Sequence, residues 1–301
     1  MKKRSGSWLR RSIRIGTGIL VFYQNSCRLT TLFFNFTFVW NKYLIFFRTK
    51  LRLMLKIVHS SLMWLFVVIS FIVLFPIFLV LWLVTFPVDN RKRYVTHYFA
   101  SLWGSLYTWL NPLWRIIIEN REKIKRGKTY ILVSNHQSLL DILVFYRLKV
   151  HFKWVSKLEL FKVPILGWVM RMNKYVQLKR GTKKGVLKMM KDSESALKKG
   201  SSLFIFPEGT RSLDGNLLPF KEGAFKLALK TQTPILPIVI EGSGNALPKK
   251  GFILKGYHRI KIKILDEIPF SDFKDSTSEN LKKKVKALIE DELTRIRKAA
   301  V

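Results

Sequence analysis

Residues 129–141, TYILVSNHQSLLD, join a short apolar run to a polar segment and the start of a helix. Residues 129–134 are typical of a buried β-strand because the run is apolar and no charge interrupts it. His136 follows directly, and Asp141 falls about one turn into the next helix, where its carboxylate can reach the imidazole. The stretch therefore predicts a strand followed by a helix in an α/β sheet, with titratable side chains at the carboxyl end of the strand.

The same alternation continues through the rest of the chain. Further apolar runs bounded by turn residues are expected to be strands, at 150–156, 174–178, 202–206, 235–241 and 258–265. The last of these alternates strictly and is therefore expected near a sheet edge. Apolar residues at helical spacing predict helices at 182–199, 220–230 and 282–298. The pattern predicts the α/β class: a mixed, largely parallel sheet flanked by helices and preceded by an N-terminal membrane helix.

A long uncharged run covers residues 62–86, LMWLFVVISFIVLFPIFLVLWLVTF. As a helix these 25 residues reach roughly 37 Å, against about 30 Å for the hydrocarbon core of a bilayer. We therefore expect a transmembrane helix; the alternatives are a buried core helix and a helix that enters one leaflet and returns at Pro76. Residues 94–114 mix tyrosine and tryptophan with small and polar residues. This composition suits an interfacial helix, and an ordinary aromatic core helix fits it equally well.

Residues 1–53 carry 11 Lys and Arg residues but no Asp or Glu. They form a basic extension of unknown role, whose apolar stretch 29–47 is open to interpretation as a poor membrane segment, a targeting segment or sequence that is not translated. Met54 stands just before the strong apolar helix, so we hypothesise that the functional chain begins there. The expected organisation is an extension at 1–53, membrane-anchoring helices at 54–114 and an α/β domain at 115–301.

The charge of the chain narrows the classes of partner. Its 301 residues include 54 Lys and Arg against 19 Asp and Glu, a formal charge of +35 at pH 7. Phosphates of nucleic acid and of anionic lipid are the common partners of such charge. A disordered basic chain is excluded because 49% of the residues are hydrophobic, and the single cysteine excludes an internal disulfide framework or a zinc finger. The aromatic residues lie in the apolar helices rather than among basic runs, which argues against nucleic acid.

Two polar segments follow predicted buried strands, where sites gather in open α/β sheets. In the first, Asp141 would hold one imidazole nitrogen of His136 and leave the other free to accept a proton. The second, residues 206–212 with the sequence FPEGTRS, holds Glu208 and Arg211 in a loop shaped by proline and glycine, and arginine suits bidentate phosphate binding. Taken singly, the first also fits a histidine at a helix start with Asp141 in solvent, and the second fits a surface turn with a local ion pair.

Together and in this order, the motifs resemble those of the glycerolipid acyltransferase family, which contains the 1-acylglycerol-3-phosphate acyltransferases. The four blocks of the family are an Asn-His-x4-Asp block, an arginine block, a Phe-Pro-Glu-Gly-Thr-Arg-Ser block and a later strand with a proline. They are matched in turn by His136 with Asp141, Lys179-Arg180-Gly181, residues 206–212 and Pro237. The second block departs from the family pattern because Gln177 and Lys179 precede Arg180, where apolar and small residues are more common. The resemblance covers residues 115–270.

The resemblance implies transfer of a fatty acyl group from a thioester to the sn-2 hydroxyl of 1-acylglycerol 3-phosphate, which gives phosphatidic acid for phospholipid biosynthesis. It implies His136 as general base and Asp141 as the residue that orients it. The implied substrate-binding residues are Arg180, Glu208, Gly209, Thr210 and Arg211. No cofactor and no metal are implied. The same motifs fit another lysophospholipid or a lyso-aminolipid as acceptor, and a non-enzymatic basic protein that binds membranes or nucleic acid is a remote alternative.

The resemblance also implies partners and a location. The implied acyl donor is acyl-coenzyme A or acyl–acyl carrier protein, and the implied acceptor is lysophosphatidic acid. We expect anionic membrane lipid as a further partner, no nucleic acid, and a membrane location with the catalytic domain facing the cytoplasm. Ser138 lies two residues from His136 and is considered as an acyl-accepting nucleophile. Neighbouring positions at a helix start point in different directions, so we favour direct attack by the substrate hydroxyl.

Overall fold

The computed structural model describes residues 23–249 and 252–299, with the backbone alone described for 23–39 and 41. The chain divides into two compact units, Met1–Leu55 and Lys56–Val301. Of the predicted basic extension, residues 1–22 lie outside the described residues, and the described part is helical.

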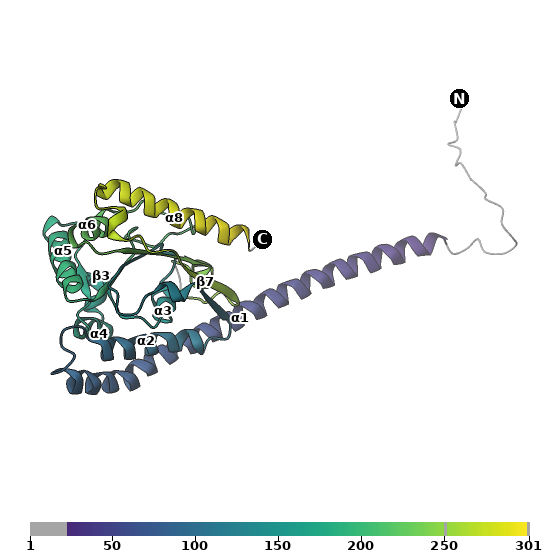
Figure 1. The fold of residues 1–301 in the computed structure, drawn as a ribbon. Helices are drawn as coiled ribbons and strands as arrows, with labels where there is room; N and C mark the ends of the chain where they lie inside the picture. Colours follow the sequence, from purple (N-terminus) through teal and green to yellow (C-terminus); the bar gives the residue numbers. More distant parts are fainter. Residues whose placement is uncertain (1–22, 250–251, 300–301) are drawn as a thin grey trace, which may run out of the picture. The chain divides into compact units, whose positions relative to one another are not determined.

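One seven-stranded sheet forms the centre of the second unit (Figure 1). Its strands are β1 (Trp114–Glu119), β2 (Ile131–Ser134), β3 (Phe152–Lys157), β4 (Val176–Leu178), β5 (Ser202–Ile205), β6 (Ile235–Glu241) and β7 (His258–Ile264). They lie in the order β1-β7-β6-β2-β5-β3-β4. All neighbouring strands are parallel except β6 and β7, which run antiparallel. The predicted mixed, largely parallel sheet is confirmed, and β7 lies next to the edge strand β1.

Helices cover both faces of this sheet, with α5, α6 and α8 on one face and α2, α3 and α4 on the other (Figure 1). The helices of this unit that follow α1 are α2 (Tyr94–Trp109), α3 (Leu140–Tyr146), α4 (Leu166–Met172), α5 (Lys183–Lys198), α6 (Gly223–Thr231), α7 (Ser243–Ala246) and α8 (Ser278–Lys298). Short 3-10 turns are η1 (Arg121–Lys123), η2 (Leu158–Lys162) and η3 (Phe270–Asp272). In β2, Leu132 packs in the core with α3, whereas Ile131 and Val133 pack in the core with α5, α6 and α8. Alternate residues of a strand face opposite sides, so the continuous apolar run of β2 buries both faces.

Helix α1 (Tyr23–Thr85) contains the predicted membrane segment and continues through Pro76. One side of it leaves large apolar side chains exposed, among them Ile72 at 65% and Val84 at 70%. Only 11% of its most apolar stretch is buried, which is unlike the core helix of a soluble protein. By length and composition this is a helix able to cross a membrane, and such an exposed apolar face fits membrane attachment.

The other side of this part of α1 packs on α2 and α4. Phe78 of α1 and Trp103 and Tyr107 of α2 are buried there, and the indole N–H of Trp103 donates to the Tyr107 hydroxyl at 2.7 Å. Tyr94 and Tyr98 of α2 stay exposed. Helix α2 therefore has a core side and an exposed aromatic side, and its position at a membrane interface stays a prediction.

Most expected elements match within two or three residues, and three departures have physical causes. Strand β1 was not predicted, because its uncharged run is only three isoleucines long and lies between Arg115 and Glu119. Helix α4 was not predicted, because it is only seven residues long. Helix α6 begins at Gly223 rather than at residue 220, because the Lys221 N–H donates to the Pro207 carbonyl oxygen at 2.9 Å and holds the preceding segment extended on the neighbouring loop.

Candidate active site

His136 and Asp141 form a hydrogen-bonded pair at the carboxyl end of β2. His136 lies two residues after Ser134, the last residue of the strand, and Asp141 is the second residue of α3. The imidazole Nδ1 lies 2.7 Å from Asp141 Oδ2. The aspartate side chain is fully buried and the histidine side chain is 14% exposed, so only the histidine reaches the surface. The alternative in which Asp141 faces solvent is therefore wrong.

Backbone amides hold the Asp141 carboxylate in place. Its Oδ2 also accepts hydrogen bonds from the N–H groups of Gln137 at 2.8 Å and Ser138 at 3.0 Å. An ionised carboxylate can only accept hydrogen bonds, so the imidazole donates from Nδ1. This tautomer leaves the Nε2 of His136 with a free lone pair that can accept a proton.

Two hydrogen bonds of the His136 backbone join it to the loop of residues 206–212, which follows β5. The Ser212 N–H donates to the His136 carbonyl oxygen at 2.8 Å, and the His136 N–H donates to Glu208 Oε1 at 2.8 Å. The Phe206 ring stacks on the imidazole, with the ring centroids 4.0 Å apart and the planes 11° apart. Because β2 and β5 are parallel neighbours, their carboxyl ends bring together two segments that lie about 70 residues apart in the sequence.

Glu208 is a buried carboxyl that supports this loop. It is 4% exposed, and its second oxygen, Oε2, accepts the N–H of Leu218 at 3.1 Å. Burial raises the pKa of Glu208 to about 7; the charge of Asp141 acts in the same direction, and the two backbone N–H donors lower the pKa. The hydrogen bonds of Glu208 thus go to the backbone of the two site segments.

Gly209, Thr210 and Arg211 form the outer part of the loop. Gly209 has a φ of 68°, which favours glycine, and a Cβ at this position would lie 3.2 Å from the Lys221 side chain. Thr210 is exposed, Arg211 is half-buried, and the Arg211 guanidinium has no hydrogen-bond or ion-pair partner in the described part of the chain. The Arg211 carbonyl oxygen accepts from Lys249 Nζ at 2.6 Å. Lys221 and Lys249 therefore add positive charge beside the loop.

Arg180 lies in the turn after β4, on the side of the sheet where the carboxyl ends of β2 and β4 lie and where His136 is found. Three strand spacings separate β4 from β2. At about 4.8 Å per spacing, the ends of these two strands are about 14 Å apart. The structure therefore places Arg211, and not Arg180, in the segment that is bonded to His136.

Two side chains of the first motif support the site in ways that were not predicted. The Asn135 amide donates to the Ile240 carbonyl oxygen at 2.8 Å and accepts the Ile240 N–H at 2.9 Å, which fixes the end of β2 to β6. Gln137 Nε2 donates to Glu241 Oε2 at 2.8 Å, and Glu241 forms an ion pair with Arg297 at 3.1 Å. These partners are far away in the sequence, and no local pattern points to them.

Ser138 is fully buried at the start of α3. Its hydroxyl donates to the Leu247 carbonyl oxygen and accepts the N–H of Leu140 at 3.2 Å. Because the hydroxyl hydrogen is already engaged, the geometry supports the expectation that Ser138 is structural rather than nucleophilic.

The site thus combines a proton acceptor with an unpaired guanidinium on a loop that is hydrogen-bonded to it. Such a set can deprotonate a hydroxyl on a molecule that is held through an anionic group. Within residues 23–249 and 252–299 no group of three or more His, Cys, Asp or Glu side chains is arranged to hold a metal ion.

Comparison with known proteins agrees with these motifs. Residues 115–241 match the family model described as Acyltransferase. The chloroplastic 1-acyl-sn-glycerol-3-phosphate acyltransferase BAT2 of Brassica napus is 39% identical over 177 residues, which cover 58% of this chain and 51% of that protein. The chloroplastic 1-acyl-sn-glycerol-3-phosphate acyltransferase LPAT1 of Arabidopsis thaliana is 41% identical over 177 residues, 58% of this chain and 49% of that protein. The chain spans about half the length of these curated relatives.

The fold is also similar to that of a solved structure. The crystal structure of the 1-acyl-sn-glycerophosphate (LPA) acyltransferase PlsC from Thermotoga maritima superposes with a TM-score of 0.70 and 25% sequence identity. The match covers 82% of this chain and 98% of that chain. The family resemblance and the fold class that the sequence predicted are both confirmed.

Proposed function

We propose that this protein is a 1-acylglycerol-3-phosphate O-acyltransferase, because residues 115–241 match the family model described as Acyltransferase. It transfers a fatty acyl group from a thioester to the sn-2 hydroxyl of lysophosphatidic acid, and the product is phosphatidic acid. The observation that carries the proposal is the buried contact of 2.7 Å between His136 Nδ1 and Asp141 Oδ2, beside a loop that presents the unpaired Arg211.

His136 acts as general base in the proposed reaction, and Asp141 is its orienting residue. The sn-2 hydroxyl oxygen attacks the thioester carbonyl carbon while its proton moves to His136 Nε2. The carbon–sulfur bond of the tetrahedral intermediate then breaks, and the departing thiolate takes the proton from the imidazolium. Asp141, held by two backbone N–H groups, keeps the productive tautomer and stabilises the imidazolium charge.

Arg211 binds the phosphate of the acceptor in this proposal. Its guanidinium suits bidentate binding of a phosphate, and Lys221 and Lys249 lie beside the same loop. Glu208, Gly209 and Thr210 shape the surface against which the glycerol unit lies. Arg180 is a second ligand of this phosphate in the proposal; it follows β4, whose carboxyl end lies about 14 Å from that of β2.

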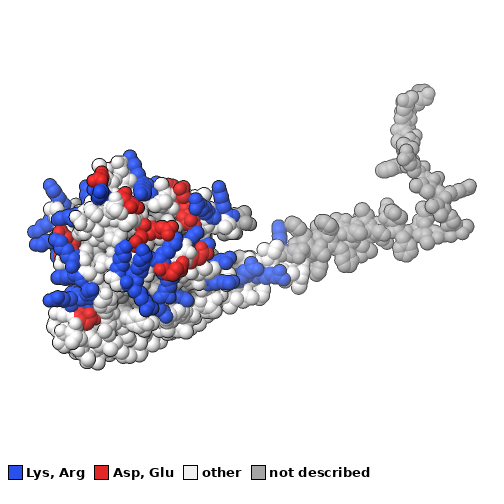
Figure 2. Space-filling view, viewed as in Figure 1, with Lys and Arg blue, Asp and Glu red and all other residues white. Residues whose placement is uncertain are grey.

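The membrane supplies the acceptor. The exposed apolar face of α1 keeps the domain on the bilayer, where lysophosphatidic acid resides, and we place the catalytic domain on the cytoplasmic side. Figure 2 shows lysine and arginine side chains spread over the visible face of the domain. This charge favours anionic membrane lipid and an acidic acyl donor, either acyl-coenzyme A or acyl–acyl carrier protein.

The test uses membranes that contain the full chain, labelled lysophosphatidic acid, and C18 thioesters of coenzyme A and of acyl carrier protein. His136→Ala is expected to lower the rate by about 10²- to 10⁴-fold while the protein stays in the membrane fraction. His258→Ala is the matched control, because this half-buried histidine lies in β7 and its Nε2 has no hydrogen-bond partner in the described part of the chain. A wild-type chain that acylates glycerol 3-phosphate or another lysolipid but not lysophosphatidic acid contradicts the proposed acceptor.

A further inference from the structure

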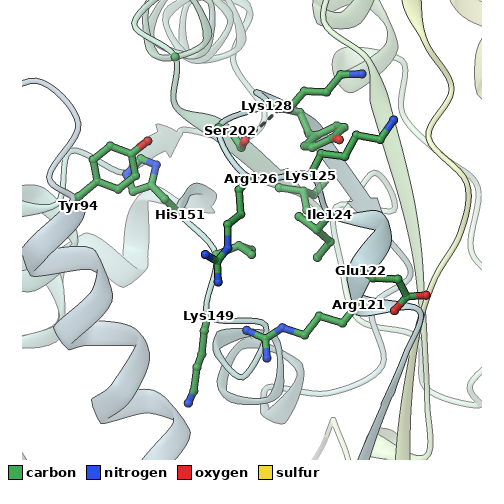
Figure 3. Close-up of a pocket in the computed structure, with 15 residues that line it drawn as sticks. Tyr94, Arg121, Glu122, Ile124, Lys125, Arg126, Lys128, Lys149, His151 and Ser202 are labelled. Carbon is green, nitrogen blue, oxygen red and sulfur yellow. Dashed lines mark hydrogen bonds between the residues drawn. The ribbon is translucent and has the colours of Figure 1, made fainter.

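A basic pocket, called the second basic pocket below to separate it from the His136 site, lies at the opposite end of the sheet from His136. It has a volume of about 670 Å³, within the range of small-molecule sites. Its walls include Tyr130, which precedes β2. They also include His151, which precedes β3, and Ser202, which begins β5; both are labelled in Figure 3. The pocket therefore opens at the amino ends of three parallel strands, whereas the His136 site uses their carboxyl ends.

Five basic side chains and one acidic side chain line this pocket: Arg121, Lys125, Arg126, Lys128, Lys149 and Glu122. Two of the bases already have a partner, since Lys125 and Lys128 both pair with Glu267, at 3.2 and 2.7 Å. In Figure 3 these two lysines point away from the middle of the pocket. The remaining bases are not balanced by the single acid of the lining.

Arg126 is the basic group best placed to meet a ligand. Figure 3 shows its guanidinium in the middle of the pocket, with the guanidinium of Arg121 reaching in from the side. Arg126 has no hydrogen-bond, ion-pair or aromatic partner in the described part of the chain. Arg121 donates from one nitrogen to the Leu148 carbonyl oxygen at 2.7 Å and keeps its other N–H groups. Lys149 lies 5.3 Å from the Trp109 ring and adds charge at the rim.

The surroundings strengthen the positive field. Lys92 is adjacent, since its Nζ lies 2.9 Å from where a Cβ on the pocket residue Gly200 would be. Lys153, two residues after His151, is 4% exposed. Burial lowers the pKa of Lys153 to about 8, and the charges of Lys174, Lys199 and Arg93 lower it further, with only Asp89 opposing. Positive charge is therefore concentrated behind this wall as well as on it.

The pocket is too far from the catalytic pair to share a ligand headgroup with it. About six residues of extended chain separate Tyr130 from His136. At about 3.3 Å per residue that is about 20 Å through the sheet. The rim residue Tyr94 is the first residue of α2, nine positions after the end of the membrane helix α1 at Thr85. The pocket therefore lies close in the chain to the membrane-attached part of the molecule.

We propose that this pocket, with Arg126 at its centre and Arg121 and Lys149 beside it, is a second binding site for a phosphate-bearing anion, separate from the acyl-transfer site. Phosphate matches the guanidinium fork and the uncompensated charge, and the volume leaves room for the organic part of the ligand. Two sources supply this chemistry: the headgroup of an anionic phospholipid, or a soluble phosphate compound.

The test measures binding by calorimetry to the full chain in non-ionic detergent, with one probe for each source. Pyrophosphate represents the soluble source, and dihexanoylphosphatidylglycerol represents the lipid source; dihexanoylphosphatidylcholine is the zwitterionic control. Arg126→Gln is the test variant and Lys191→Gln is the matched control, because Lys191 is also exposed and has no partner among the described side chains. Both variants remove one positive charge, and acyl transfer is measured on each as evidence of correct folding.

We expect Arg126→Gln to weaken binding of at least one anionic probe about tenfold, the size of one lost charged hydrogen bond, and Lys191→Gln to leave it unchanged. Binding should also weaken with added salt. Tighter binding of the lipid assigns the site to a headgroup, and tighter binding of pyrophosphate assigns it to a soluble phosphate. Equal affinities in wild type and Arg126→Gln for both anionic probes, or no binding of either, overturn the proposal.

Discussion

Replacing Asp141 with asparagine separates the two tasks of this carboxylate, which are to orient His136 and to stabilise its charge. In the structure Oδ2 accepts three hydrogen bonds, from His136 Nδ1 and from the N–H groups of Gln137 and Ser138. The other oxygen, Oδ1, is buried without a partner. An amide can therefore place its oxygen at the Oδ2 position and keep all three bonds. Asp141→Asn then keeps the tautomer and removes the negative charge.

The size of the effect follows from the charge alone. When His136 takes the proton, its positive charge lies about 4 Å from the centre of the carboxylate, and at an effective dielectric constant of 20 the attraction is about 4 kcal/mol. The amide oxygen still accepts a hydrogen bond and recovers part of this energy. A remaining loss of about 3–4 kcal/mol corresponds to about 10²- to 10³-fold in rate, since 1.36 kcal/mol is tenfold.

The assay is kcat/KM for lysophosphatidic acid, measured together with the melting temperature. Asp192→Asn is the control, because this exposed aspartate pairs only with Lys188 on the surface of α5. The double variant His136→Ala with Asp141→Asn should be no slower than His136→Ala alone, because Asp141 acts only through the imidazole. Activity of Asp141→Asn within threefold of wild type, at unchanged melting temperature, would refute the reasoning.

Three further outcomes are expected. The pKa of Glu208, raised from 4.5 to about 7, means that the folded chain holds a proton that the unfolded chain releases, so wild-type stability falls as pH rises from about 4.5 to 7. The melting temperature of Glu208→Gln should therefore fall less over this pH range than that of wild type. Parallel curves of melting temperature against pH for the two proteins would contradict the explanation. Ser138→Ala should form product within tenfold of the wild-type rate. Its free energy of unfolding in denaturant titrations should be about 1–3 kcal/mol lower, because the N–H of Leu140 loses its acceptor. Loss of activity without loss of stability would instead argue that Ser138 is a nucleophile. Arg211→Lys should raise KM for lysophosphatidic acid about tenfold with little change in kcat, and an unchanged KM removes Arg211 from the phosphate site.

The sequence predicted the contact between His136 and Asp141 because the information for it is local. His136 and Asp141 are five residues apart, and a strand followed by a helix turn brings such residues together whatever the remainder of the chain does. The contact with the loop of residues 206–212 was predictable in a weaker sense. Both segments end buried strands, but only the parallel pairing of β2 with β5 makes them neighbours.

Side chains that are bonded to distant backbone could not be predicted in this way. Asn135 completes the hydrogen bonding between β2 and β6 at Ile240, and Gln137 reaches Glu241 at the end of the same strand. The substrate contact expected of Glu208 stays a prediction, and the sequence did not indicate that its two oxygens accept the backbone N–H groups of His136 and Leu218. Such partners depend on strand order, which periodicity and local motifs do not specify.

The second basic pocket was equally hidden in the sequence. The +35 charge is spread along the chain, so no run of residues marks the pocket that Arg121, Arg126 and Lys149 line. Their gathering depends on three strands beginning side by side and on the segment that joins β1 to β2. Total charge therefore indicates an anionic class of partner but not the position of a site.

A crystal structure of the protein with bound lysophosphatidic acid tests the central claim most directly. The account predicts the sn-2 hydroxyl oxygen at hydrogen-bond distance, about 3 Å, from His136 Nε2, with the phosphate of the same molecule on the guanidinium of Arg211. A lysophosphatidic acid whose phosphate lies on Arg211 while its hydroxyl faces away from His136, or one that is bound without contact to either side chain, contradicts it.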